Sequence, residues 1–267
     1  MLSVESILIF ILLGIVVGLA AGLFGIGGGA IMVPILTTFF LMQGVPAEMV
    51  IHVALGTSMA SIIGTSLSSL FAHHKRQSVI WPIVKSIAPG VILGSLLATY
   101  FVAHVSSKVL AIFFTCFISY VAVQMFLNFQ PAPSRQIPGK VPIFFAGSGI
   151  GLISAIVAIG GGTLTVPFLA WHNIPLKKAI GTSAAVGFPI AVSGTIGYVI
   201  NGWDVSDKQS YLYGFIYLPA VLLISLASYF TAPIGARWAH NLSVPTLKKV
   251  FALFLVLISI KMLWSVI

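Results

Sequence analysis

Long apolar stretches alternate with short polar connections along the whole chain. Most of these stretches approach the roughly 20 residues that a helix needs to cross a hydrocarbon core about 30 Å thick. The connections between them are too short to form a separate soluble domain. The predicted segments are 5–24, 30–43, 49–71, 79–103, 108–128, 141–158, 163–172, 178–200, 210–232 and 246–267. This pattern predicts an all-α polytopic membrane protein with ten helical segments.

The composition of the chain agrees with a membrane location. Apolar residues make up 59% of the 267 positions and charged residues only 6%, which is more apolar surface than a soluble domain could bury. The net charge of +9 comes from short basic clusters between the segments, without the basic and aromatic platform of a nucleic-acid-binding protein. We therefore attribute the charge to orientation in the membrane and expect no nucleic-acid partner.

A glycine-rich phrase occurs twice inside apolar sequence. The first is Gly-Ile-Gly-Gly-Gly at 25–29, and the second is Ala-Ile-Gly-Gly-Gly at 158–162; each is followed by Val-Pro. Later in each half comes the sequence Gly-Thr-Ser, at 56–58 and at 181–183. Three consecutive glycines remove side-chain packing and add backbone freedom, so each phrase should interrupt its helix within the membrane.

The duplicated phrases predict two repeats of about five helical segments each. We place the N-terminal repeat at 1–129, a polar cytoplasmic linker at 130–140 and the C-terminal repeat at 141–267, all within one integral membrane domain. A further match aligns Pro89 of the first repeat with Pro219 of the second.

The charges indicate how the two repeats are oriented. If each glycine phrase divides a hairpin that returns to its side of origin, as a re-entrant loop or as two full spans, basic and acidic residues separate to opposite sides. The basic side then holds His73, His74, Lys75, Arg76, Arg135, Lys140, Lys177, Lys178, Arg237, Lys248 and Lys249. The acidic side holds Glu5, Glu48, Asp204 and Asp207, and only two basic residues of the loops, Lys108 and Lys208, lie there with them. A single interrupted crossing would break this separation, so we predict inverted repeats with the basic side in the cytoplasm.

A helix that begins after such a phrase would direct unpaired N–H groups and a positive dipole end toward the middle of the membrane. Such an end binds anions, and glycine leaves its amides accessible. Hydroxyl groups nearby could complete the coordination. The alternatives are close helix packing for the glycines and bonds to carbonyls of the same helix for the hydroxyls. The predicted substrate-binding residues are Gly27, Gly28, Gly29, Thr57, Ser58, Gly160, Gly161, Gly162, Thr163, Thr182 and Ser183.

Two further side chains are candidates for assisting transport. His52 precedes the first Gly-Thr-Ser by one helical turn and could carry a coupling proton, or could simply lie near the membrane interface. Lys85 could attract substrate at the mouth of the pathway, or could extend its ammonium group to the membrane surface.

Several function classes lack their signatures in this sequence. No Asp or Glu lies deep in a predicted segment, which disfavours a transporter of bare metal cations. A P-loop, a Gly-x-Ser-x-Gly elbow and a HExxH pair are also missing, and Cys116 is the only cysteine. We therefore expect no enzyme activity, no metal site and no cofactor.

The two glycine phrases with Val-Pro and Gly-Thr-Ser resemble those of the TauE/SafE family of membrane proteins, the sulfite exporters. The similarity runs over essentially the whole chain and includes the basic turn at 72–76, although Ala158 stands where the first phrase has Gly25. The resemblance implies a secondary transporter that exports a small anion, such as sulfite, sulfoacetate or a related organic anion, across a bacterial inner membrane.

Alternating access, in which the inverted repeats rock around the bound anion, is the mechanism that we expect. An anion channel or facilitator without alternating access is the main alternative, and a membrane scaffold that carries no anion is another. The expected partners are a small anion and the lipid bilayer, with a second copy of the chain in a homodimer left open.

Overall fold

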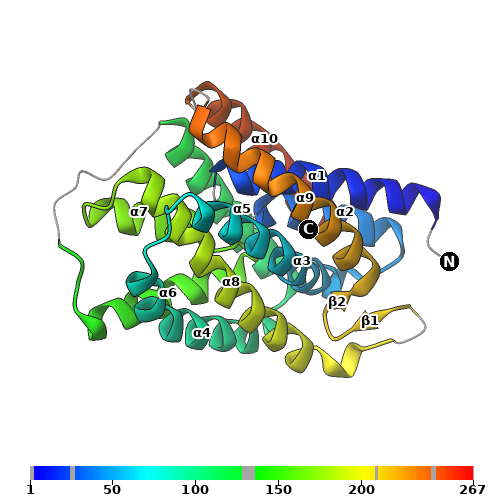
Figure 1. The fold of residues 1–267 in the computed structure, drawn as a ribbon. Coiled ribbons are helices and arrows are strands. Elements are labelled where there is room, and N and C mark those ends of the chain that lie inside the picture. Colours follow the sequence, from blue (N-terminus) through cyan, green and yellow to red (C-terminus); the bar gives the residue numbers. More distant parts are fainter. Residues whose placement is uncertain (1–2, 25–27, 128–135, 208–209, 242–244, 267) are drawn as a thin grey trace.

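The computed structural model describes residues 3–24, 28–127, 136–207, 210–241 and 245–266 (Figure 1). Almost all of these residues are helical, and six helices are long and apolar enough to cross a membrane: α1, α3, α4, α5, α8 and α9. The helices are α1 (Val4–Phe24), α2 (Gly29–Met42), α3 (Ala47–Lys75), α4 (Trp81–Ala103), α5 (Ser107–Phe126), α6 (Lys140–Ile156), α7 (Gly162–Trp171), α8 (Leu176–Asn201), α9 (Leu218–Asn241) and α10 (Pro245–Val266). The predicted all-α polytopic membrane fold is confirmed.

The helix boundaries agree closely with the predicted segments except before α9. The sequence predicted one helix over 210–232, and this is wrong. A short 3-10 helix, η1 (Trp203–Val205), is followed by an antiparallel hairpin of β1 (Leu212–Tyr213) and β2 (Ile216–Tyr217), and only then does α9 begin. The turn of the hairpin contains Gly214 at φ +59°, a backbone angle that favours glycine. The first part of the apolar run at 210–232 therefore forms a β-hairpin, and only the rest is helical.

The five helices of the first half, α1–α5, make the same main packing contacts as the five helices of the second half, α6–α10. Helix α1 packs along α9 as α6 packs along α4, and α3 contacts α9 as α8 contacts α4. The pairs α3 with α8 and α5 with α10 join the two halves directly. Figure 1 shows α3 and α8 between α1 and α2 on one side and α6 and α7 on the other. The two halves are thus interlocked; their inversion relative to the membrane stays a prediction.

Glycines bring helices of different halves into backbone contact. A Cβ at Gly18 of α1 would lie 2.8 Å from the Cα of Ser228 in α9, and a Cβ at Gly151 of α6 would lie 2.7 Å from the Cα of Val91 in α4. Such contacts are shorter than any side chain permits, so only glycine allows this approach.

These glycine contacts also correct the alignment of the repeats. Gly18 and Gly151 are equivalent positions, because each lies seven residues before its glycine phrase. Their partners Ser228 and Val91 are therefore equivalent too, whereas the alignment of Pro89 with Pro219 would pair Val91 with Val221. The predicted alignment is therefore wrong by about two helical turns in this part of the chain. The β-hairpin explains the error, because it occupies sequence that the prediction had assigned to the helix.

The two Gly-Thr-Ser threonines make reciprocal hydrogen bonds between the halves. Thr57 Oγ1 in α3 accepts a hydrogen bond from the amide of Tyr217, directly before α9, at 3.0 Å. Thr182 Oγ1 in α8 accepts one from the amide of Ile80, directly before α4, also at 3.0 Å. Both hydroxyls are fully buried. Each half therefore satisfies a backbone donor at the start of a helix in the other half.

We expect Gly151→Ala to destabilise the protein by roughly 1–3 kcal/mol, because the added methyl group must push α6 away from α4. Gly149→Ala, in the same helix, is a matched control, since nothing lies within 4 Å of a Cβ at that position. Thermal unfolding of the purified variants in detergent measures the difference. Equal melting temperatures for the two variants would contradict the packing argument.

Thr57→Val and Thr182→Val should each destabilise the protein by about 1–3 kcal/mol, because each leaves a buried amide without its acceptor. Thr57→Ser and Thr182→Ser keep a hydroxyl and should lose less. Thermal unfolding again gives the comparison. A valine variant as stable as its serine counterpart would show that the hydrogen bond contributes little.

Candidate functional site

Both glycine phrases interrupt their helices as predicted. Helix α1 ends at Phe24 and α2 begins at Gly29, while α6 ends at Ile156 and α7 begins at Gly162. The residues that precede α2 and α7 are Gly28, with φ 80° and ψ −14°, and Gly161, with φ 76° and ψ −20°. Both are left-handed conformations that residues with a Cβ adopt only under strain. The same backbone geometry therefore starts a helix in each half.

The two interruptions meet inside the protein. A Cβ at Gly29 would overlap the carbonyl oxygen of Ala158, so the first break lies directly against the second. Helix α8 also contacts the second break, because Gly187 lies against the carbonyl of Gly160. Residues 28–30 and 157–162 are all buried. The described residues of the two breaks therefore lie in the protein interior, against each other and the central helices.

Two helix N-termini begin at this meeting point. The Gly28 carbonyl accepts a hydrogen bond from the amide of Met32 at 3.1 Å, and the Gly161 carbonyl accepts one from the amide of Thr165 at 2.8 Å. The amides of Ile31 and Leu164 donate to the same two carbonyls, at 3.1 and 3.2 Å. The amides without a carbonyl one turn earlier in the helix are therefore those of the first two residues, Gly29 and Ala30 in α2 and Gly162 and Thr163 in α7. They point toward the break together with the positive end of the helix dipole, which amounts to about half an elementary charge. This arrangement favours a negatively charged ligand.

Hydroxyl groups without a partner lie at the start of α7. Thr163 Oγ1 and Thr165 Oγ1 are buried and form no hydrogen bond within the described part of the chain. Thr165 Oγ1 lies 3.6 Å from the position that a Cβ of Gly161 would take, so it lies beside the break. Ser58 Oγ in α3 is also buried without a partner among the described residues. Such groups cost free energy unless a ligand or water satisfies them.

The other predicted binding residues have different surroundings. Thr57 and Thr182 hold the two halves together through the hydrogen bonds described above. Ser183 Oγ donates to a carbonyl of its own helix at 2.8 Å, the alternative considered for such hydroxyls. Lys85 is exposed near the start of α4. Gly27 lies outside the described residues. A role in substrate binding for Thr57, Thr182, Ser183 and Gly27, and a role in substrate entry for Lys85, stay predictions.

His52 braces the connection between α4 and α5. Its Nε2 lies 3.0 Å from the carbonyl oxygens of Val102 and Val105, and its Nδ1 lies 3.3 Å from Ser107 Oγ. Ile62, the α3 residue that contacts the first glycine break, is two to three turns further along the helix, about 15 Å away. These contacts support the interpretation of His52 as an interface residue, and its role in proton coupling stays a prediction.

Thr165 is a candidate beside the break that the sequence prediction did not include. Its signal was its spacing, because a residue four positions after Gly161 returns to the same face of the helix as the break. Among the described residues, no three His, Cys, Asp or Glu side chains come together where they could hold a metal ion. The chemistry at the breaks is thus that of neutral hydrogen-bond donors.

Comparisons with known proteins agree with this arrangement. A family model described as sulfite exporter TauE/SafE matches residues 10–262. A probable membrane transporter protein of Haemophilus influenzae is 38% identical over 260 residues, covering 96% of this chain and 97% of the relative. A probable membrane transporter protein of Methanocaldococcus jannaschii is 29% identical, covering 88% of this chain and 87% of the relative. No solved structure matches the chain significantly.

The family match spans nearly the whole described chain, including both glycine breaks and both Gly-Thr-Ser sequences. The relatives are named as transporters over a similar length. The chain is therefore a multi-pass membrane transporter that belongs to the TauE/SafE family.

Proposed function

We propose that the protein exports a small anion, such as sulfite, sulfoacetate or a related organic anion, from the bacterial cytoplasm by alternating access. The observation that carries the proposal is the contact between the start of α2, at Gly29, and the break before α7, at Ala158, with each of these two helices started by a left-handed glycine. Sulfite, a sulfonate and a short carboxylate all present oxygens that backbone amides can bind. The family description supports sulfite and its relatives as the first anions to test.

The site that we propose consists of the amides that follow Gly28 and Gly161, with the hydroxyls of Thr163, Thr165 and Ser58 as further donors. None of these groups carries a fixed charge. An anion held by a buried Lys or Arg would leave slowly, whereas neutral donors can bind it strongly enough to select it and still release it. The predicted assistance by Thr57, Thr182 and Ser183 would require their present hydrogen bonds to change during transport.

The repeat architecture supports alternating access. The two halves pack with exchange symmetry around α3 and α8, and the charge pattern of the connections fits an inverted arrangement in an inner membrane with the basic side in the cytoplasm. Rocking of one half against the other would then expose the central site alternately. A cytoplasm that is electrically negative favours anion exit by about 2.3 kcal/mol per charge per 100 mV.

Replacing Thr163 and Thr165 by valine should weaken anion binding by roughly tenfold for each hydroxyl that contacts the substrate. The stability of the free protein should not fall, because each substitution removes a buried hydroxyl that lacks a partner. Thermal-shift titration with sulfite, sulfoacetate and simple carboxylates measures both quantities, since a ligand raises apparent stability by mass action.

Thr38→Val is the matched control for this titration. Thr38 lies in α2, and its hydroxyl donates to the Pro34 carbonyl of its own helix at 3.0 Å. Its anion affinity should remain that of the unaltered protein. Unchanged affinity in the Thr163→Val and Thr165→Val variants would remove these hydroxyls from the proposed site.

Counterflow in reconstituted vesicles separates a transporter from a channel. A carrier that alternates access should exchange labelled external anion for unlabelled internal anion, and its flux should saturate with concentration. A channel or facilitator should show neither property, and a scaffold should show no anion flux. Non-saturating flux without exchange would therefore overturn alternating access while leaving the anion site intact.

A further inference from the structure

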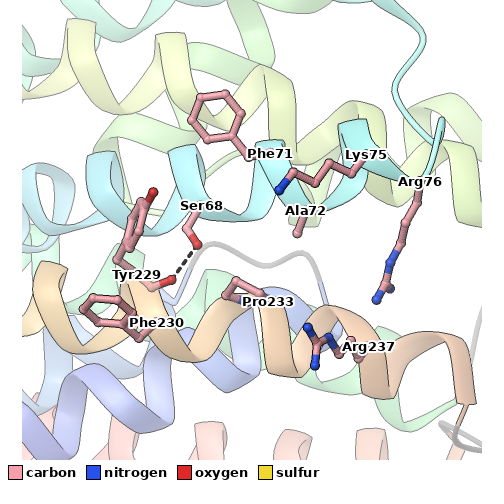
Figure 2. Close-up of a pocket in the computed structure, with 9 residues that line it drawn as sticks. All are labelled: Ser68, Phe71, Ala72, Lys75, Arg76, Tyr229, Phe230, Pro233 and Arg237. Atoms are coloured by element: carbon pink, nitrogen blue, oxygen red, sulfur yellow. Dashed lines mark hydrogen bonds between the residues drawn. The ribbon is translucent and has the colours of Figure 1, made fainter.

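A second site, away from the glycine breaks, lies between the C-terminal ends of α3 and α9. It is a cavity of about 350 Å³. Figure 2 shows side chains of both helices around it, with the cations gathered toward one end and the aromatic rings toward the other. Its lining residues are Ser68, Phe71, Ala72, Lys75, Arg76, Tyr229, Phe230, Pro233 and Arg237.

The cavity holds three positive charges, and the acidic residues of the chain lie elsewhere. The sequence contains only four acidic residues. Glu48 lies in the first turn of α3, at the opposite end of the helix from Lys75, a separation of about 40 Å. Asp204 and Asp207 precede the start of α9, while Arg237 lies near its end. Glu5 lies in the first turn of α1, about 25 Å along the helix from Gly22, the α1 residue that packs against Ala236. No acidic side chain of the described residues therefore lies at this end of the groove, and its three positive charges would attract an external anion.

One of the cations is held in place by the protein. Arg76 Nη1 donates a hydrogen bond to the Ala236 carbonyl at 2.8 Å, which joins the end of α3 to α9. A guanidinium group has five N–H donors, so this bond leaves others for a ligand oxygen. Ser68 Oγ donates to the Tyr229 carbonyl at 2.5 Å and closes the deeper end of the groove between the helices (Figure 2). The groove is therefore a structured surface with a basic rim.

The equivalent groove in the other half carries no charge. The helix equivalences established above relate α3 to α8 and α9 to α4. The counterparts of Lys75, Arg76 and Arg237 are Ile200, Asn201 and Tyr100. Ile200 and Tyr100 are 65% and 56% exposed, so that surface is open and mostly apolar. The basic residues are not required by the packing of these helices, because the second copy packs in the same way without them.

The aromatic end of the groove is exposed. Phe71 and Phe230 line the cavity, yet 48% and 67% of their surfaces remain accessible. In a membrane these faces contact acyl chains. Along α9 the lining changes from Phe230 to Arg237 within about two turns, or roughly 10 Å, which is the order of distance between acyl chain and phosphate in a lipid leaflet.

We propose that this groove binds an anionic phospholipid, with the phosphate near Lys75, Arg76 and Arg237 and an acyl chain along Phe71 and Phe230. The basic rim recognises the phosphate, and the exposed apolar wall is the feature that distinguishes a lipid from a soluble anion. Basic pockets between membrane helices suit such headgroups on the positively charged side of the protein. The site is separate from the proposed transport site, because Ser58, the donor that α3 contributes there, lies nearly three helical turns, or about 15 Å, before Ser68 at the deeper end of the groove.

Lipid titration of the full-length purified protein tests the proposal. Phosphatidylglycerol should raise its thermal stability in detergent, whereas phosphatidylcholine and inorganic phosphate should have little effect. The double variant Lys75→Gln/Arg237→Gln should bind phosphatidylglycerol roughly tenfold more weakly or worse, because two phosphate contacts are lost. Lys75→Arg/Arg237→Lys keeps both charges and should retain most of the binding.

Lys177→Gln/Lys178→Gln is the matched control, since it removes two exposed charges at the start of α8. It should leave the phosphatidylglycerol effect unchanged. An equal loss in this control would show a general surface charge effect and would overturn a specific site. Stabilisation by inorganic phosphate or sulfite that disappears in Lys75→Gln/Arg237→Gln would assign the groove to a soluble anion and would overturn the lipid.

Discussion

The close approach of two interrupted helices is the constraint on which the centre of this protein depends. Gly29 lies so near the Ala158 carbonyl that no side chain fits between them. Helices can end in the interior of a membrane protein only where the exposed backbone is buried in protein or lines a water-filled cavity. The described residues of each break pack against the other break or against a central helix, so each irregular segment helps to bury the exposed backbone of the other.

The same use of glycine extends outward from the centre. Gly18 and Gly151 let α1 and α6 rest on the backbones of α9 and α4. In the Gly-Thr-Ser sequences, Gly56 and Gly181 let the chain before α9 and α4 come near enough for the adjacent threonine to accept its hydrogen bond. Van der Waals contact between backbones and a few buried hydrogen bonds thus replace the hydrophobic driving force that lipid removes.

Much of the fold could be predicted from the sequence because membrane helices need long apolar runs and glycine triplets disrupt them. The hairpin at Leu212–Tyr217 escaped prediction because its residues are as apolar as those of α9, and only the turn at Gly214 distinguishes the two. In the site, the left-handed glycines could be anticipated from chain flexibility. The partners of Thr57 and Thr182 could not, because they lie 160 and 102 residues away in sequence.

The reciprocal bonds of Thr57 and Thr182 have a consequence for synthesis. The chain emerges from the ribosome from its N-terminus, and the amide of Ile80 meets its acceptor only when residue 182 has been made. The first five helices can enter the bilayer before that moment, but the Ile80 amide among them still lacks its hydrogen-bond acceptor. Biogenesis of the first half is therefore finished by the second, and a nascent chain arrested before α8 would remain an open assembly intermediate.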